Sequence, residues 1–161
     1  MNSVPRGFGL AAVGGGALRI VNSFTGNVLP DGVLTTLYFV TDIFLLTGIA
    51  GLWWRQRATT GLAGTAGIVI FIAGIVLIRL SALHVEGLGY QLGAAVALIG
   101  LAVYSLEALV LQGAPQWAPI LWLLSLVLGV GAMLGATILI ILSGLVFGLG
   151  FVAMGSRLLR S

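Results

Sequence analysis

The stretch that decides the fold is residues 119–155, PILWLLSLVLGVGAMLGATILIILSGLVFGLGFVAMG, which contains no charged residue. A single α-helix of this length would exceed about 50 Å, whereas the hydrocarbon core of a bilayer is about 30 Å thick. Its middle, GVGAMLGAT (129–137), has three glycines, which are poor helix formers. We therefore predict two membrane helices, 119–134 and 138–155, joined by a tight turn near Gly135. The alternative is one long tilted helix over 117–142, followed by an interfacial segment.

The rest of the chain is also mostly apolar. Only 7% of the 161 residues are charged, against about 25% in an ordinary soluble domain, so apolar side chains must face lipid. Stretches of about 20 apolar residues are long enough to span a bilayer, and polar or Gly/Pro-containing breaks separate them. We predict an all-α transmembrane bundle of six helices in three hairpins, forming one integral membrane domain over 1–161, with five helices as the alternative. The other four predicted spans are 7–24, 33–54, 61–83 and 89–112.

The positions of the arginines favour six helices over five. Cytoplasmic loops of membrane proteins collect Arg and Lys, and with six helices the arginines outside the spans all lie on one side. We therefore predict a multi-pass cell-membrane protein with both termini in the cytoplasm. An alternative for residues 1–24 is a cleaved signal peptide. The arginines concerned are Arg6, Arg55, Arg57, Arg157 and Arg160.

Tryptophans lie near the predicted helix ends on the same side. Trp53, Trp54, Trp117 and Trp122 all have this position. Trp and Tyr are enriched at membrane–water interfaces. The pattern predicts an interfacial aromatic belt at the cytoplasmic face.

The missing residue types exclude much chemistry. The chain has no Cys, no Lys and one His, His84, so thiol catalysis, zinc–thiolate sites, a Schiff base to a cofactor and a multi-His metal site are all excluded. The four carboxylates are too few and too scattered for a catalytic cluster. We expect no enzyme activity, no metal, no cofactor and no nucleic-acid partner. His84 and Glu86 are expected in a short outer loop.

Ionisable groups inside the membrane are costly and point to function or to pairing. From the rise per residue, Arg19, Asp42 and Arg79 all fall in the outer half of the bilayer, which predicts a charge cluster. Helix periodicity adds neighbours on the same helix faces. The cluster could line an outward-open polar pocket; alternatively, each arginine reaches the headgroups and Asp42 bonds to a neighbouring helix. The complete candidate site is Arg19, Asn22, Thr35, Tyr38, Asp42 and Arg79.

Glu107 is expected at the inner end of its helix. There it could pair with Arg55 or Arg57, or with Arg157, as an ion pair at the cytoplasmic boundary. A proton-relay role is the alternative.

Small residues four apart suggest close helix packing. The pairs are Gly89 with Gly93, Gly131 with Gly135 and Gly144 with Gly148. We expect packing inside one bundle, with a homodimer seam as the alternative. Arg19 and Arg79 precede similar short turns, but the residues reveal no inverted repeat.

The sequence favours three functions in this order. The first is a non-catalytic accessory or structural membrane subunit, because the chain lacks catalytic motifs and has short loops. The second is a small oligomeric transporter or channel for an anionic or small polar solute, because arginine binds carboxylate and phosphate well. The third is a lipid- or quinone-binding protein. The Arg-only, Gly-rich and Ala-rich composition is typical of a bacterial inner-membrane protein.

Overall fold

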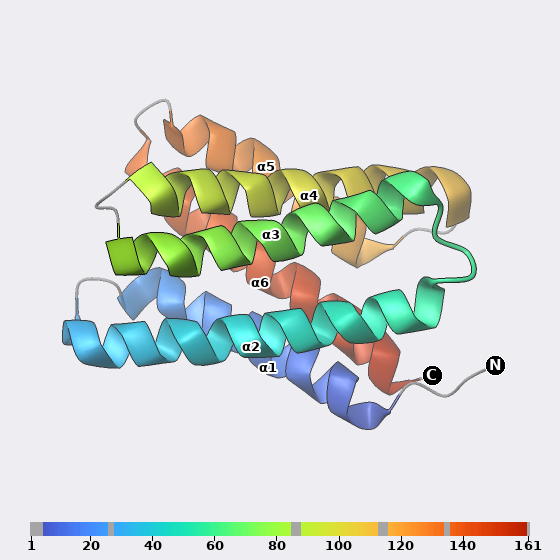
Figure 1. Cartoon of the computed structure of the whole chain (residues 1–161), viewed down its shortest axis with the longest axis horizontal. Helices are drawn as coiled ribbons and strands as arrows, with labels where there is room; N and C mark the ends of the chain where they lie inside the picture. Colours follow the sequence, from blue (N-terminus) through green and yellow to red (C-terminus); the bar gives the residue numbers. More distant parts are fainter. Residues whose placement is uncertain (1–4, 26–27, 85–87, 113–115, 134–135, 161) are drawn as a thin grey trace.

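The computed structural model describes residues 5–25, 28–84, 88–112, 116–133 and 136–160, and in these it is a bundle of six α-helices (Figure 1). The predicted all-α fold with six helices is therefore confirmed. The bounds are α1 Arg6–Thr25, α2 Asp31–Gln56, α3 Leu62–His84, α4 Leu88–Gln112, α5 Trp117–Met133 and α6 Thr137–Leu159.

The apolar stretch 119–155 forms two helices, so the five-helix alternative is wrong. α5 ends at Met133 and α6 begins at Thr137, inside the glycine-containing run where helix propensity is lowest. Gly135, where the turn was predicted, lies outside the described residues, as does Glu86. The helix α3 extends to His84, which was expected in a loop.

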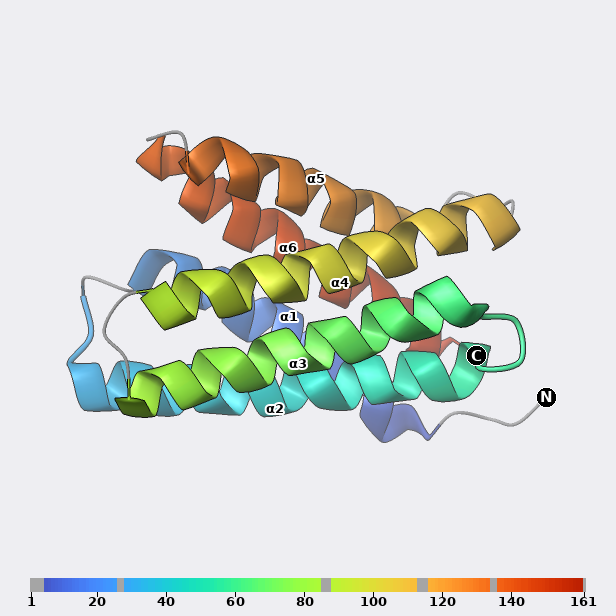
Figure 2. The same cartoon turned by 45° about the horizontal axis from the view of Figure 1, so that its top comes forward.

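Helices that follow each other in the sequence pack as antiparallel hairpins, and an additional contact joins α1 to α6. Both views show α3 alongside α4 and α5 alongside α6 (Figure 2), and α1 packs on α2 and extensively on α6. The contact between α2 and α3 is the sparsest among the packed helix pairs. This seam is therefore the least tightly packed part of the bundle.

The chain termini lie at the same end of the bundle (Figure 1). We call it the basic end, because two helices end there with arginines. Arg55 lies in the last turn of α2 and Arg57 follows its last residue, while Arg157 lies in the last turn of α6 and Arg160 follows its last residue. The opposite end, where α2 begins at Asp31, is called the Asp31 end. This arrangement matches the predicted grouping of arginines.

Within the described residues, four helices are long and apolar enough to cross a membrane: α2, α3, α4 and α6. The helix α5 is apolar but shorter, with its apolar part at Trp117–Ala132. Large apolar side chains are exposed on the outside of the bundle, for example Leu62, Val69 and Val110. A surface of this kind is suited to lipid rather than to water.

Glycines seven residues apart create two close helix–helix seams. Between α3 and α4, a Cβ on Gly74 would lie 2.7 Å from the carbonyl oxygen of Gly93, and a Cβ on Gly67 would lie 2.6 Å from that of Gly100. Side chains there would push the helices apart, so glycine is required for the close approach. Gly93 and Gly148, which were singled out in the sequence by a spacing of four, do pack inside the bundle. The glycines that contact a backbone across each seam, however, are spaced seven residues apart.

The seam between α1 and α6 repeats this arrangement. A Cβ on Gly16 would lie 2.5 Å from the carbonyl oxygen of Gly148, and one on Gly155 would lie 2.7 Å from that of Gly9. Gly9 and Gly16 precede Gly93 and Gly100 by 84 residues, while Gly67 and Gly74 precede Gly148 and Gly155 by 81. The glycine positions of the α1–α6 seam therefore match those of the α3–α4 seam.

Aromatic rings fill the centre of the bundle. The rings of Phe71, Phe147 and Phe151 contact one another, and Phe151 lies 5.1 Å from Trp122, whose ring is 6.0 Å from that of Tyr104. We call these five residues the aromatic cluster.

One member of the predicted aromatic belt belongs instead to this core. Trp122 is fully buried, whereas Trp53, Trp54 and Trp117 are exposed. The belt prediction was wrong for Trp122, because the ring packs between helices instead of facing the interface.

Candidate functional site

An ion pair joins α2 to α3 in the half of the bundle nearer the Asp31 end. The Arg79 guanidinium donates from Nε to Oδ2 of Asp42 at 2.5 Å, and its Nη2 contacts the same oxygen. The side chains are 26% and 14% exposed, respectively. It is the only ion pair within the described residues, and it bridges the most sparsely packed seam.

Arg19 lies near this pair but contacts no carboxylate of the described residues. Its guanidinium carbon is 5.8 Å from the centre of the Phe147 ring, and a nitrogen of the group reaches towards Gly144 on α6. The side chain is half-buried, and its charge acts on Asp42 through space. Arg19, Asp42 and Arg79 therefore form a cluster with one excess positive charge, which we call the charge cluster.

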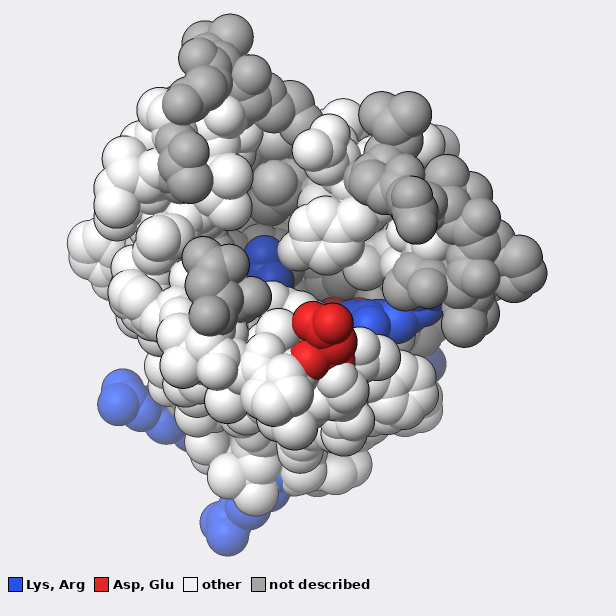
Figure 3. Space-filling view, turned by 90° about the vertical axis from the view of Figure 1, so that its left-hand side faces the viewer, with Lys and Arg blue, Asp and Glu red and all other residues white. Residues whose placement is uncertain are grey.

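The Asp31 end is hollowed between the helix ends. Figure 3 shows a basic side chain inside this hollow, and acidic and basic side chains next to each other on its wall. Low-dielectric walls around a cation strengthen its field. The hollow is thus electrostatically suited to an anion.

The other predicted site residues are Asn22, Thr35 and Tyr38. Asn22 is buried, and its Nδ2 donates to Oγ1 of Thr41 at 2.9 Å, while its Oδ1 has no hydrogen-bond partner among the described residues. Thr35 is exposed and its hydroxyl donates to the carbonyl of Asp31 in its own helix, at 2.8 Å. Tyr38 is half-buried. Asn22 thus serves α1–α2 packing, and Thr35 bonds within α2.

Glu107 was predicted to pair with an arginine, but in the structure it accepts a backbone hydrogen bond instead. Oε1 of Glu107 accepts the backbone N–H of Gly61 at 2.8 Å, just before α3 begins. Arg55 donates instead to the carbonyl of Arg157, at 3.1 Å, and Arg57 lies over the Trp54 ring, 4.6 Å from its centre. A carboxylate at a helix N-terminus satisfies a free N–H and the helix dipole together, so Glu107 caps α3.

This assignment predicts the energetics of Glu107 variants. Glu107→Ala should lower the free energy of unfolding by about 1 kcal/mol, the usual contribution of a helix N-cap. Glu107→Gln retains an acceptor and should lose about half as much. Thermal unfolding in detergent measures both. In a double-mutant cycle, Glu107→Ala and Arg57→Ala should be additive, whereas a real ion pair would couple them.

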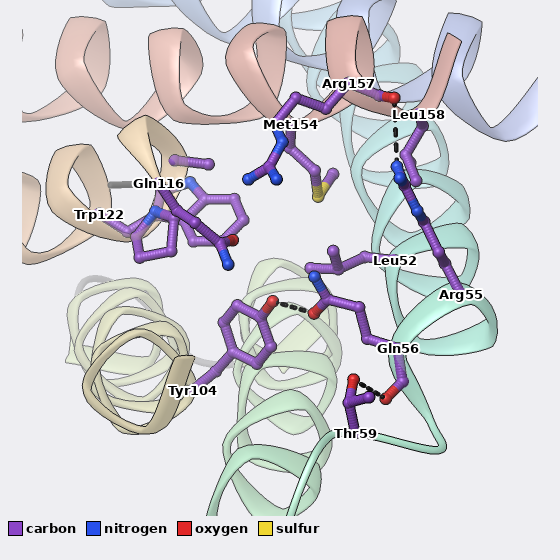
Figure 4. Close-up of a pocket in the computed structure, with 12 residues that line it drawn as sticks. Leu52, Arg55, Gln56, Thr59, Tyr104, Gln116, Trp122, Met154, Arg157 and Leu158 are labelled. Atoms are coloured by element: carbon purple, nitrogen blue, oxygen red, sulfur yellow. Dashed lines mark hydrogen bonds between the residues drawn. The ribbon is translucent and has the colours of Figure 1, made fainter. Parts of the chain in front are cut away.

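A second polar site, absent from the sequence predictions, lies at the basic end. A cavity of about 240 Å³ lies among the ends of α2 and α6, the start of α5, and Tyr104 of α4. We call it the basic-end cavity. Figure 4 shows the guanidinium of Arg157 and the amides of Gln56 and Gln116 pointing towards one space above the Tyr104 hydroxyl. The lining is Leu52, Arg55, Gln56, Thr59, Tyr104, Gln116, Ala118, Pro119, Trp122, Met154, Arg157 and Leu158.

The aromatic cluster lies between the charge cluster and the basic-end cavity. Phe147 touches the region of Arg19, and Trp122 and Tyr104 line the basic-end cavity. α1, α2 and α3 each supply one residue of the charge cluster, and α4, α5 and α6 supply Tyr104, Trp122 and Arg157 of the cavity. The two polar sites therefore lie at opposite ends of the bundle, and α2 contributes to both, with Asp42 at one and Arg55 and Gln56 at the other.

The described residues contain no group of three or more His, Asp or Glu side chains that could hold a metal ion. No protein family matches this chain, and no curated protein and no solved structure is significantly similar to it.

Proposed function

We propose that this chain is a small membrane protein that binds an anionic solute at the charge cluster and carries it across the bilayer. The observation that carries the proposal is the half-buried Arg19, whose guanidinium lies over the Phe147 ring without a carboxylate contact among the described residues. Arg79 is already neutralised by Asp42. A guanidinium with no carboxylate contact among the described residues supports binding of carboxylate, phosphate or a smaller anion.

The matching glycine seams support transport in particular. Many transporters are built from repeats of opposite orientation, with their sites between the repeats. Here the α1–α6 and α3–α4 glycine seams are the equivalent parts. The aromatic cluster separates the hollow from the basic-end cavity and would act as the barrier between two access directions.

The test is anion-dependent stability, followed by flux. The purified protein is titrated with chloride, nitrate, inorganic phosphate and acetate, against gluconate at equal ionic strength. We expect a saturable rise of the unfolding temperature with one of these anions, since a ligand of the folded state stabilises it. Vesicles of phosphatidylcholine and phosphatidylglycerol that contain the protein should release the same anion.

Arg19→Gln should abolish both effects, while Arg6→Gln, at the exposed start of α1, serves as the control with the same loss of charge. If no anion stabilises the wild type more than Arg19→Gln, anion binding here is wrong. The accessory-subunit function would then be favoured, with the Asp42–Arg79 pair serving only the α2–α3 seam.

A further inference from the structure

We infer that the basic-end cavity is a binding site for a phosphate group, reached from the basic end of the bundle. The inference concerns the opposite end from the charge cluster and does not depend on the proposed transport. It rests on the charge, the hydrogen-bonding groups and the position of the cavity.

The charge of the lining is one-sided. Arg55 and Arg157 line the cavity, and no carboxylate of the described residues does. The nearest acid along α4 is Glu107, which is engaged by the backbone N–H of Gly61. Two guanidinium groups without an acid favour an anion, because arginine matches the oxygens of a phosphate in pairs.

The polar contacts in the cavity leave donors facing inward. Tyr104 donates its hydroxyl proton to Oε1 of Gln56, so the remaining hydrogen-bonding group of that amide is its NH₂. Nη1 of Arg55 donates to the backbone carbonyl of Arg157 at 3.1 Å, which links the end of α2 to the end of α6. Figure 4 shows the Arg157 guanidinium directed to the same space as the Gln56 amide. The donors of Arg157 and Gln56 around one space, with the charge of Arg55 in the same lining, favour an oxyanion.

The position of the cavity fits a phosphate that is delivered from a membrane surface or from solution. It lies where the apolar helices end, at the level where headgroups and interfacial aromatic residues meet. Arg57 and Arg160 are exposed near it, and basic residues at this level attract anionic lipids. One wall is apolar, with Leu52, Met154 and Trp122, which suits the glycerol or acyl part next to a lipid phosphate.

The test compares two phosphate sources on the purified full-length chain. Unfolding temperatures are measured with inorganic phosphate, and separately in mixed micelles that contain phosphatidylglycerol or, as the neutral reference, phosphatidylcholine. Stabilisation by inorganic phosphate identifies a free-phosphate site, and stabilisation by phosphatidylglycerol alone identifies a lipid-headgroup site. Either result supports the inference, and no stabilisation by either overturns it.

The matched variants are Arg157→Gln and Arg160→Gln, which remove the same charge three residues apart on α6. Arg157 lines the cavity and Arg160 does not. Arg157→Gln should weaken the apparent affinity about tenfold or more, as expected for a lost charged hydrogen bond, while Arg160→Gln should bind as the wild type. Equal weakening by both would show only a general charge effect and would overturn the inference.

A second variant tests the space itself without changing charge. Ala118→Leu extends a side chain of the lining into the cavity and should abolish the stabilisation. Arg19→Gln should leave it intact, so failure of the proposed transport at the charge cluster and failure of this site are separable. Phosphate stabilisation that survives both Arg157→Gln and Ala118→Leu would place the phosphate elsewhere.

Discussion

Replacing Asp42 with asparagine should lower the free energy of unfolding by about 2 kcal/mol. Breaking a fully buried ion pair by removing one partner costs about 3–5 kcal/mol, because the other charge remains buried and unpaired. Arg79 is 26% exposed, so part of that penalty is relieved by solvent. The effect should appear as a lower unfolding temperature in detergent, with α2 and α3 separating most easily.

The control for this prediction is Asp31→Asn, at the exposed first residue of α2. It removes the same charge and should change the unfolding free energy by about 0.5 kcal/mol or less. The double variant Asp42→Asn with Arg79→Gln should lose less than the sum of the two single variants, since no unpaired charge remains. Unchanged stability of Asp42→Asn would show that the pair does not hold the seam.

The same argument explains why the sequence predicted the charge cluster. Intramembrane charges are expensive, and the rise per residue placed Arg19, Asp42 and Arg79 at similar depth. Two of them do form an ion pair. The length of a bilayer similarly forced the stretch 119–155 to break, and it breaks between Met133 and Thr137.

The sequence could not predict which local interaction would win at Glu107. Three arginines were plausible partners by depth, but the backbone N–H of Gly61 is the actual donor. Gly61 has no side chain in the way: a Cβ there would lie 2.9 Å from Oε2 of Glu107. This depends on how α3 and α4 are packed against each other, which periodicity along one helix does not contain.

The basic-end cavity was missed for the same reason. Its lining comes from four helices, and no pair of lining residues on one helix forms a recognisable motif. Trp122 had the position of an interfacial residue in the sequence, yet its ring packs against Tyr104 and Phe151. The one signal available was Arg157 with Arg55 at ends predicted to lie on the same side.

Gly74→Ala should be among the most destabilising single-methyl changes in this protein. The added Cβ would lie 2.7 Å from the Cα of Ala97 and from the carbonyl oxygen of Gly93. Both neighbours are backbone atoms, so only separation of α3 from α4 can relieve the clash. Overpacking typically costs 1–3 kcal/mol, and we expect a loss of about 3 kcal/mol, measured by unfolding in detergent.

The other glycine seam, between α1 and α6, gives an independent test. Gly16→Ala should destabilise by a similar amount, because its Cβ would lie 2.5 Å from the carbonyl oxygen of Gly148. Gly14→Ala, two residues away on α1, is the control: its nearest neighbour is a ring carbon of Phe44 at 3.7 Å, an ordinary contact. Alanine has a higher helix propensity than glycine, so this control should be neutral or slightly stabilising. Equal tolerance of alanine at Gly74, Gly16 and Gly14 would contradict both glycine seams.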